Sequence, residues 1–139
     1  MTISMQEYFD KTVEHLRGMD RRSFIAGRDV CAYLDRQGRK CAVGCHIPDG
    51  HPAQNFNSNA NGTGVDELAE RYPDLEGIAF PAGRSGILLA GQLQKTHDDP
   101  DNWIPTVGFD GEGQLHKVAD IFNLKYTRQR RREPEASCD

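Results

Sequence analysis

The sequence contains no long apolar segment, and from its first residues we expect no secretion leader. None of its apolar runs approaches the roughly 18 residues that cross a bilayer. Its first residues, MTISMQEYFDKTVEH, include acids where a signal peptide has a basic start and an apolar stretch. We therefore expect a cytoplasmic protein without membrane contact, in which thiols stay largely reduced.

Two common signatures of chemistry are also missing. The chain has no glycine-rich phosphate loop, and its four cysteines form no C-x2-C pair of the kind that structural zinc sites usually show. At 139 residues, with 37% hydrophobic and 27% charged residues, it has the size and composition of one globular domain and shows no internal repeat. Any prediction of function therefore depends on a few local features.

The formal net charge of -4 hides an uneven distribution. Five basic residues stand close together near the C-terminus: Lys125, Arg128, Arg130, Arg131 and Arg132. Without them, 12 basic residues remain against 21 acidic ones, a balance of -9. We therefore expect an acidic body that repels nucleic acid, and a charged, disordered tail over 125–139 through which any phosphate contact would be made.

Hydrophobic periodicity predicts four helices. Ser4 followed by Glu7 is typical of a capping box, and the apolar residues that follow predict a helix over 5–17, which Gly18 ends. The other three helices are predicted to begin near Val65 and end before Pro73, to run from a cap at Ser85 to His97, and to follow a cap at Asp110.

One short region has the alternation of a β-hairpin. Residues 30–35 and 39–45 would be its strands, and Gly38 would take the left-handed position in its turn. In an alternative interpretation, a brief strand is followed by a short helix over 41–47, although Gly44 is unfavourable in a helix.

These elements predict an α+β fold in which about four helices pack with one small β-hairpin. We expect a single globular domain over 1–124. Within it, the segment 51–64 is rich in Asn, Gly and Ser and is expected to be a mobile loop. Such a loop suits either contact with a partner or a tolerated insertion.

The segment 31–51 holds three of the four cysteines and two of the five histidines. Thiolates and imidazoles are ligands that zinc prefers, so one hypothesis is a structural zinc site. Its ligands would be Cys31, Cys41, Cys45 and either His46 or His51. The spacings of nine and three intervening residues are not typical of zinc proteins. The alternative is a hairpin whose cysteines are small buried core residues, with no cofactor.

A second hypothesis is nucleophilic catalysis by a cysteine hydrolase or transferase. Cys41 or Cys45 would be the nucleophile and His97 its base, while Asp98 or Gln94 would orient the imidazole or bind an oxyanion. The order Cys, His, Asp occurs in several cysteine hydrolases. In a chain with four cysteines and five histidines it also arises by chance, and a core-edge histidine is the alternative.

Several side chains are candidates for contact with a ligand or partner. Residues 83–86 precede a predicted helix, whose first N–H groups together with Arg84 could receive an anion, although ordinary capping explains the same residues. The candidates for such contacts are Tyr33, Arg84, Gln94, His97 and Trp103.

One combination of motifs is distinctive. The segment C-x-Y-x4-G-x2-C-A-V-G begins at Cys31 and is followed by Ile47-Pro48-Asp49. Farther along come L-Q-x2-H-D at 93–98, Trp103, and a closing I-F-N-L at 121–124. In these features the chain resembles a group of small uncharacterised proteins found in phage and bacterial genomes. The group has no established activity, so the resemblance transfers no catalytic residue and implies an accessory role in phage–host biology.

We therefore expect a protein that acts by binding a host macromolecule or a small ligand. An acidic body with polar loops suits an inhibitor of a basic host protein, such as a nucleic-acid-binding defence enzyme. The alternatives are the cysteine enzyme and the zinc domain described above.

Overall fold

A computed structural model describes residues 2–25, 30–31, 33–35, 37–54 and 64–127. These residues form four α-helices, which are α1 (Met5–Arg17), α2 (Val65–Arg71), α3 (Arg84–Asp98) and α4 (Glu112–Phe122). Two antiparallel pairs of strands join β1 (Phe24–Ile25) to β2 (Val30–Cys31) and β3 (Trp103–Ile104) to β4 (Gly108–Phe109). The short 3-10 helices are η1 (Gly44–His46), η2 (Pro52–Gln54), η3 (Pro73–Leu75) and η4 (Pro100–Asn102). The predicted α+β class is confirmed.

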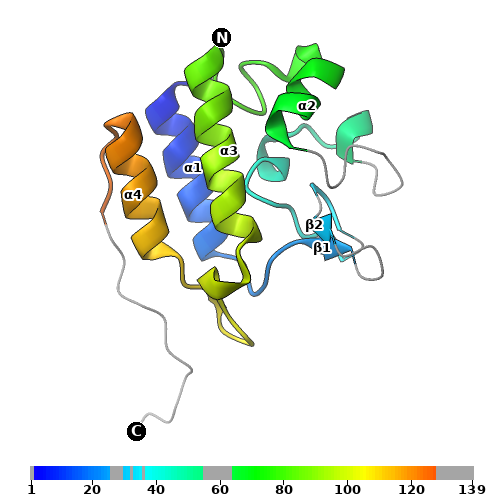
Figure 1. Ribbon diagram of the computed structural model, residues 1–139. Coiled ribbons are helices and arrows are strands. Elements are labelled where there is room, and N and C mark those ends of the chain that lie inside the picture. Colours follow the sequence, from blue (N-terminus) through cyan, green and yellow to red (C-terminus); the bar gives the residue numbers. More distant parts are fainter. Residues whose placement is uncertain (1, 26–29, 32, 36, 55–63, 128–139) are drawn as a thin grey trace, which may run out of the picture.

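Helix α3 is the central element and contacts α1, α2 and α4 (Figure 1). Figure 1 shows α1 and α3 running in the same direction and α4 returning in the opposite one, with α2 beside the upper half of α3. The segments that follow α1 and α3 therefore meet at the lower end of the molecule. Nowhere in the described residues is there a helix with the length and apolarity that crossing a membrane requires.

Helix α1 has the bounds that its periodicity predicts. The Ser4 hydroxyl accepts a hydrogen bond from the Glu7 N–H (3.1 Å), so it satisfies one of the N–H groups that a helix start leaves unpaired. The amphipathic pattern then places one face of the helix in the core: Tyr8, Phe9, Thr12, Val13 and Leu16.

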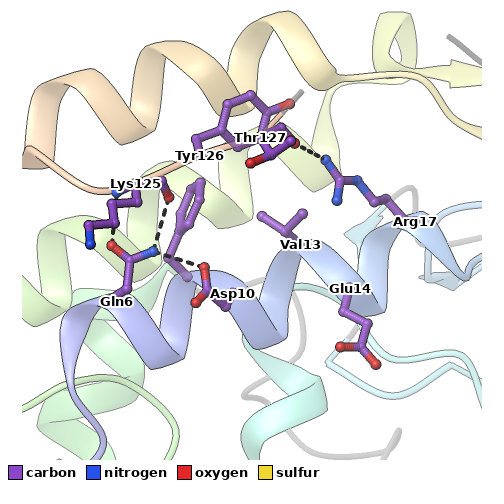
Figure 2. Close-up of a pocket in the computed structure, with 9 residues that line it drawn as sticks. Gln6, Asp10, Val13, Glu14, Arg17, Lys125, Tyr126 and Thr127 are labelled. Atoms are coloured by element: carbon purple, nitrogen blue, oxygen red, sulfur yellow. Dashed lines mark hydrogen bonds between the residues drawn. The ribbon is translucent and has the colours of Figure 1, made fainter. Parts of the chain in front are cut away.

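The packed part of the chain continues past the predicted domain boundary at residue 124. The Gln6 side chain bonds both backbone groups of Lys125, donating to its carbonyl (3.0 Å) and accepting from its N–H (2.8 Å). Arg17 donates to the carbonyl of Thr127 (2.9 Å), and Figure 2 shows residues 125–127 lying along α1. Three residues of the predicted disordered tail therefore belong to the domain, while 128–139 lie outside the described residues.

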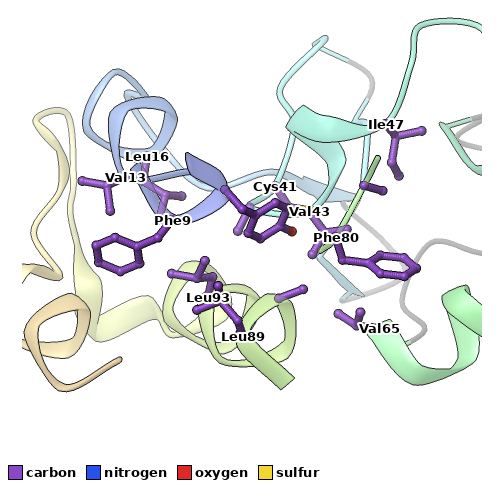
Figure 3. Close-up of a cluster of buried hydrophobic side chains, with 14 of the residues drawn as sticks. Phe9, Val13, Leu16, Cys41, Val43, Ile47, Val65, Phe80, Leu89 and Leu93 are labelled. Atoms are coloured by element: carbon purple, nitrogen blue, oxygen red, sulfur yellow. The ribbon is translucent and has the colours of Figure 1, made fainter. Parts of the chain in front are cut away.

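The core gathers on both sides of α3. Figure 3 shows Leu89 and Leu93 of this helix between residues from α1, such as Phe9, and residues from the loops and α2, such as Phe80 and Val65. All five are nearly inaccessible to solvent. Burying such large side chains contributes about 1.5–3 kcal/mol each, so this cluster is the main source of stability.

Two predicted helix caps are wrong. Helices α3 and α4 begin after Gly83 and Gly111, without a side-chain cap. The cap position is Gly83, whose φ of +89° favours glycine. The predicted cap, Ser85, is the second residue of the helix. The predicted cap Asp110 instead donates its N–H to the carbonyl of Asn102 (2.6 Å), which holds β4 against η4.

The predicted hairpin over 30–35 and 39–45 is also wrong. Strand β2 pairs with the preceding strand β1, with Phe24 opposite Cys31, and the described residues 39–45 form no strand. Gly38 does turn the chain with φ +84°. The residues after it form a helical turn, as the alternative interpretation proposed. This turn requires glycine at position 44, because a Cβ added there would stand 2.0 Å from the Tyr33 carbonyl oxygen.

The segment 51–64 is partly described. The expected mobile loop begins with η2, and the side-chain amide of Gln54 donates to the carbonyl of Gly44 (2.8 Å). His51 bonds the Asp74 carboxylate (2.7 Å). These contacts attach the start of the segment to the domain, and residues 55–63 lie outside the described residues.

Candidate functional site

Residues from several predicted motifs meet at the C-terminal end of α3. The helix supplies Gln94, His97 and Asp98, and the segment after it supplies Trp103. The loop that carries Cys41 approaches from the other side, because Gln94 accepts a hydrogen bond from the Val43 N–H (3.2 Å). Residues far apart in the sequence are therefore joined at one end of the central helix.

His97 is fully buried, and hydrogen bonds occupy both of its ring nitrogens. Its Nε2 accepts a bond from the Ser23 N–H (3.0 Å), so Nδ1 carries the proton and donates to the Asp98 carboxylate (2.8 Å). The same carboxylate oxygen accepts from the Gln94 amide (2.8 Å). The network fixes a neutral imidazole in one tautomer and links α3 to the segment after α1.

The last four carbonyls of α3 all find donors. The Lys95 carbonyl accepts from the Asp99 N–H, and the Thr96 carbonyl from the Asn102 amide (2.9 Å). The His97 carbonyl accepts from the Trp103 indole (2.7 Å), and the Asp98 carbonyl from the Arg22 guanidinium (2.6 Å). A helix end otherwise leaves these acceptors unpaired. The contacts of His97 and Trp103 thus have a structural role, which is to anchor three chain segments to one helix end.

Neither described cysteine of the predicted enzyme has an activated thiol. Cys41 is fully buried, burial raises the pKa of its thiol well above the usual range, and its sulfur accepts the Gly44 N–H (3.3 Å). Burial raises the pKa of Cys45 to about 12, and its thiol donates to the Ala42 carbonyl (3.3 Å). Asp98 and the Ser23 N–H occupy the two nitrogens of His97, so the described contacts include the predicted His–Asp bond but link neither thiol to the imidazole.

Slow alkylation of both thiols is the expected result in the native protein. Because only the thiolate reacts, Cys41 and Cys45 should be modified by iodoacetamide at about pH 8 about a hundredfold or more slowly than free cysteine. Quench times followed by peptide mass mapping would measure each rate, and the urea-unfolded protein is the control. A native rate near that of free cysteine at either residue would restore the enzyme hypothesis and identify its nucleophile.

The predicted zinc ligands are held by other groups where they are described. His46 Nε2 bonds the Thr12 hydroxyl (2.7 Å), and its ring stacks on Tyr8 at 4.1 Å. His51 bonds Asp74, and the side chain of Cys31 lies outside the described part of the structure. Within the described residues, no group of three or more His, Cys, Asp or Glu side chains is placed to hold a metal ion. The zinc site therefore stays a prediction from sequence.

A cleft of about 490 Å³ lies beside the anchored helix end. One wall is apolar and comes from the chain after α3: Pro100, Trp103, Ile104 and Pro105. The other wall is charged and comes from the segment after α1 and from the Gly38 turn: Asp20, Arg21, Arg22, Asp35 and Arg39. A concave site that joins apolar surface to a few fixed polar groups is the usual form of a binding site.

Asp20 and Asp35 fix the charged wall. Asp20 receives two hydrogen bonds from Arg39 (3.0 and 3.1 Å), which lower the pKa of the Asp20 carboxyl, and it lies 3.9 Å from Arg21. Asp35 is buried, and one of its oxygens accepts the N–H groups of Gln37 and Arg39 (2.9 and 2.8 Å). Three guanidinium groups and two carboxylates line this wall. Their balance of +1 is opposite in sign to the charge of the chain.

A second surface is strongly acidic. From α2 to Glu76, the residue after η3, the sequence places five carboxylates against one arginine, and all of these residues are exposed. We call this the acidic surface; its carboxylates are Asp66, Glu67, Glu70, Asp74 and Glu76. Glu67 pairs with Arg71 (3.0 Å), while α2 buries Val65 and Leu68 on its other face. The helix therefore directs its acids outward.

The remaining predicted contact residues do not join these sites. Arg84 is exposed at the first residue of α3, and Tyr33 is buried. The charged wall of the cleft was missed from the sequence, because Asp20 and Arg39 meet only through the fold. The sole available signal was the cluster Asp20-Arg21-Arg22 directly after a predicted helix.

Comparisons with protein-family models, with curated proteins and with solved structures find no match for this chain. The resemblance to phage and bacterial proteins thus stays a prediction from the sequence.

Proposed function

We propose that this protein is a cytoplasmic binding protein that attaches to a basic protein partner through the acidic surface. The observation that carries the proposal is the acidic surface itself, where five exposed carboxylates stand beside a single arginine between α2 and Glu76. Surfaces of opposite charge steer two proteins together and select against wrong partners. The excess of acids over bases outside the basic stretch at 125–132 acts in the same direction.

The state of the reactive side chains supports binding in place of catalysis. The two described thiols have raised pKa values, and the buried imidazole at the end of α3 has both nitrogens engaged. The acids on α2, in contrast, are exposed. Together with the sequence resemblance, this arrangement suits an inhibitor that occupies the basic surface of a host protein, such as a nucleic-acid-binding defence enzyme.

Removing charge from α2 should weaken binding of a basic probe. The triple variant Asp66→Asn, Glu67→Gln, Glu70→Gln should bind a fluorescently labelled oligo-arginine peptide about tenfold more weakly, since exposed charge pairs contribute about 0.2–1 kcal/mol each. Fluorescence anisotropy would measure affinity between about 50 and about 300 mM salt, and binding to the unaltered protein should fall steeply over that range.

A matched variant separates local recognition from net charge. Glu14→Gln, Asp101→Asn, Asp120→Asn also removes three exposed carboxylates, but outside the acidic surface. It should weaken binding by about twofold or less. Equal losses of affinity in the two variants would show that binding of the peptide depends only on total charge. That result would overturn the assignment of the partner site to the acidic surface.

A further inference from the structure

The cleft beside the end of α3 lies away from the acidic surface and offers the opposite charge. Its charged wall begins at Asp20, three residues after α1, and its apolar wall begins at Pro100, two residues after α3. Figure 1 places the ends of both helices at the lower side of the molecule, while α2 lies at the upper side. A ligand of the cleft would therefore not compete with a partner on the acidic surface.

The Asp20 carboxylate contacts two guanidinium groups in this cleft. Asp20 is fully engaged by Arg39 through two hydrogen bonds, and its contact with Arg21, at 3.9 Å, is the longer one. The side chain of Arg21 is 72% exposed. A carboxylate brought by a ligand would meet the unshared faces of this guanidinium, which binds carboxylates in a bidentate manner.

The apolar wall lies within reach of the same ligand. Trp103 and Ile104 form strand β3, which pairs with β4, and the indole N–H of Trp103 is bonded to the His97 carbonyl. The ring also contacts Phe109 edge to face at 5.3 Å. Because these contacts hold the wall in place before any ligand arrives, binding would cost little conformational entropy.

From this juxtaposition we propose that the cleft binds a short peptide segment of a partner protein that carries a carboxylate beside an apolar side chain. The carboxylate pairs with Arg21, and the apolar side chain lies on Trp103 and Ile104. The acidic balance of the rest of the chain opposes a nucleic acid, whose phosphates would extend beyond the cleft.

Trp103 supplies a direct readout, because it is the only tryptophan in the chain. A blocked hexapeptide of alternating glutamate and leucine should change the tryptophan emission in a saturable way. A lysine–leucine hexapeptide and a glutamate-only hexapeptide should each bind at least about fivefold more weakly, since the first repels Arg21 and the second leaves the apolar wall uncovered.

Charge reversal at one exposed arginine identifies the site. Arg21→Glu should weaken binding of the glutamate–leucine peptide about tenfold. Lys117→Glu, the same change of charge at an exposed residue of α4, should leave the affinity within about twofold. Ile104→Ser should weaken it about threefold and provides a second variant that leaves the charges intact. Thermal melts of each variant would show that the fold persists.

Three outcomes would overturn the proposal. Equal affinity for the glutamate–leucine and lysine–leucine peptides would show that charge has no part in binding. Equal effects of Arg21→Glu and Lys117→Glu would show that the peptide does not bind in the cleft. Tighter, Arg21-dependent binding of a hexameric deoxythymidine oligonucleotide would assign the cleft to nucleic acid instead. None of these results depends on the acidic surface, which the oligo-arginine experiment tests separately.

Discussion

Alanine at Gly86 is expected to lower the free energy of unfolding by about 3 kcal/mol or more, and the melting temperature by about 10 °C. Gly86 is buried in the first turn of α3, and a Cβ added there would stand 1.9 Å from the carbonyl oxygen of Pro81 and 2.4 Å from its carbonyl carbon. These are backbone atoms, so no side-chain rotation relieves the overlap. The start of the central helix would have to move away from the segment that leads into it.

Gly91 in the same helix is the matched control. An added Cβ there meets nothing within 4 Å, so Gly91→Ala should raise the unfolding free energy by about 0.5–1 kcal/mol through helix propensity alone. Urea denaturation followed by circular dichroism would measure both variants. If Gly86→Ala proved as stable as the unaltered protein, the close contact between α3 and Pro81 would be contradicted.

The helices were predictable because their signals are local. The bounds of α1 follow from Ser4 and an apolar stripe, and α2 ends before Pro73 as its sequence indicates. The caps of α3 and α4 were not predictable. These helices begin after Gly83 and Gly111, where the path of the preceding chain, and not a capping side chain, sets the first residue. Sequence propensity does not report such tertiary constraints.

The prediction of the hairpin was wrong for a related reason. Alternation over 30–35 and 39–45 is compatible with a strand pair, yet β2 pairs with the preceding strand and the later residues form η1. Strand pairing depends on which segment is available across the sheet, and short alternating runs specify it weakly. The second pair, β3 with β4, spans only two residues in each strand and has too little pattern to be recognised.

The candidate site was predicted in part. Asp98 or Gln94 was predicted to act with His97, and Trp103 was singled out separately; the fold brings all four together at the end of α3. Their proposed chemistry depended on exposure and on access to a thiol, which sequence does not contain. Hydrogen bonds to backbone carbonyls, such as that from Trp103 to His97, have no sequence pattern at all. The cleft was missed because its walls come from segments about 80 residues apart.

Stability is expected to fall as the pH drops from about 6.5 to about 4. Burial lowers the pKa of His46 from 6.5 to about 4, and the nearby charges of His15 and Lys11 add to the effect. Thr12 donates its hydroxyl proton to the Tyr8 carbonyl (2.7 Å), so its oxygen accepts the His46 Nε2–H, and the neutral ring stacks on Tyr8. Folding therefore favours the uncharged imidazole.

The sign of the pH effect follows from this preference. A pKa lower in the folded state than in the unfolded state means that the unfolded chain binds more protons below about pH 6.5. The stability contributed by His46 is thus complete above that pH and is lost progressively down to about pH 4. The full loss is on the order of 3 kcal/mol. Burial lowers the pKa of His15 as well, so its contribution has the same direction.

Replacing His46 with a residue that does not titrate tests this account. Glutamine retains an N–H donor for Thr12, so His46→Gln should flatten the decline in unfolding free energy between about pH 6.5 and about pH 4. His116→Gln, at a side chain that is 56% exposed, should leave the decline unchanged. Urea titrations at several pH values would give both profiles. A decline as steep in His46→Gln as in the unaltered protein would place the acid sensitivity elsewhere, with His15 as the next residue to replace.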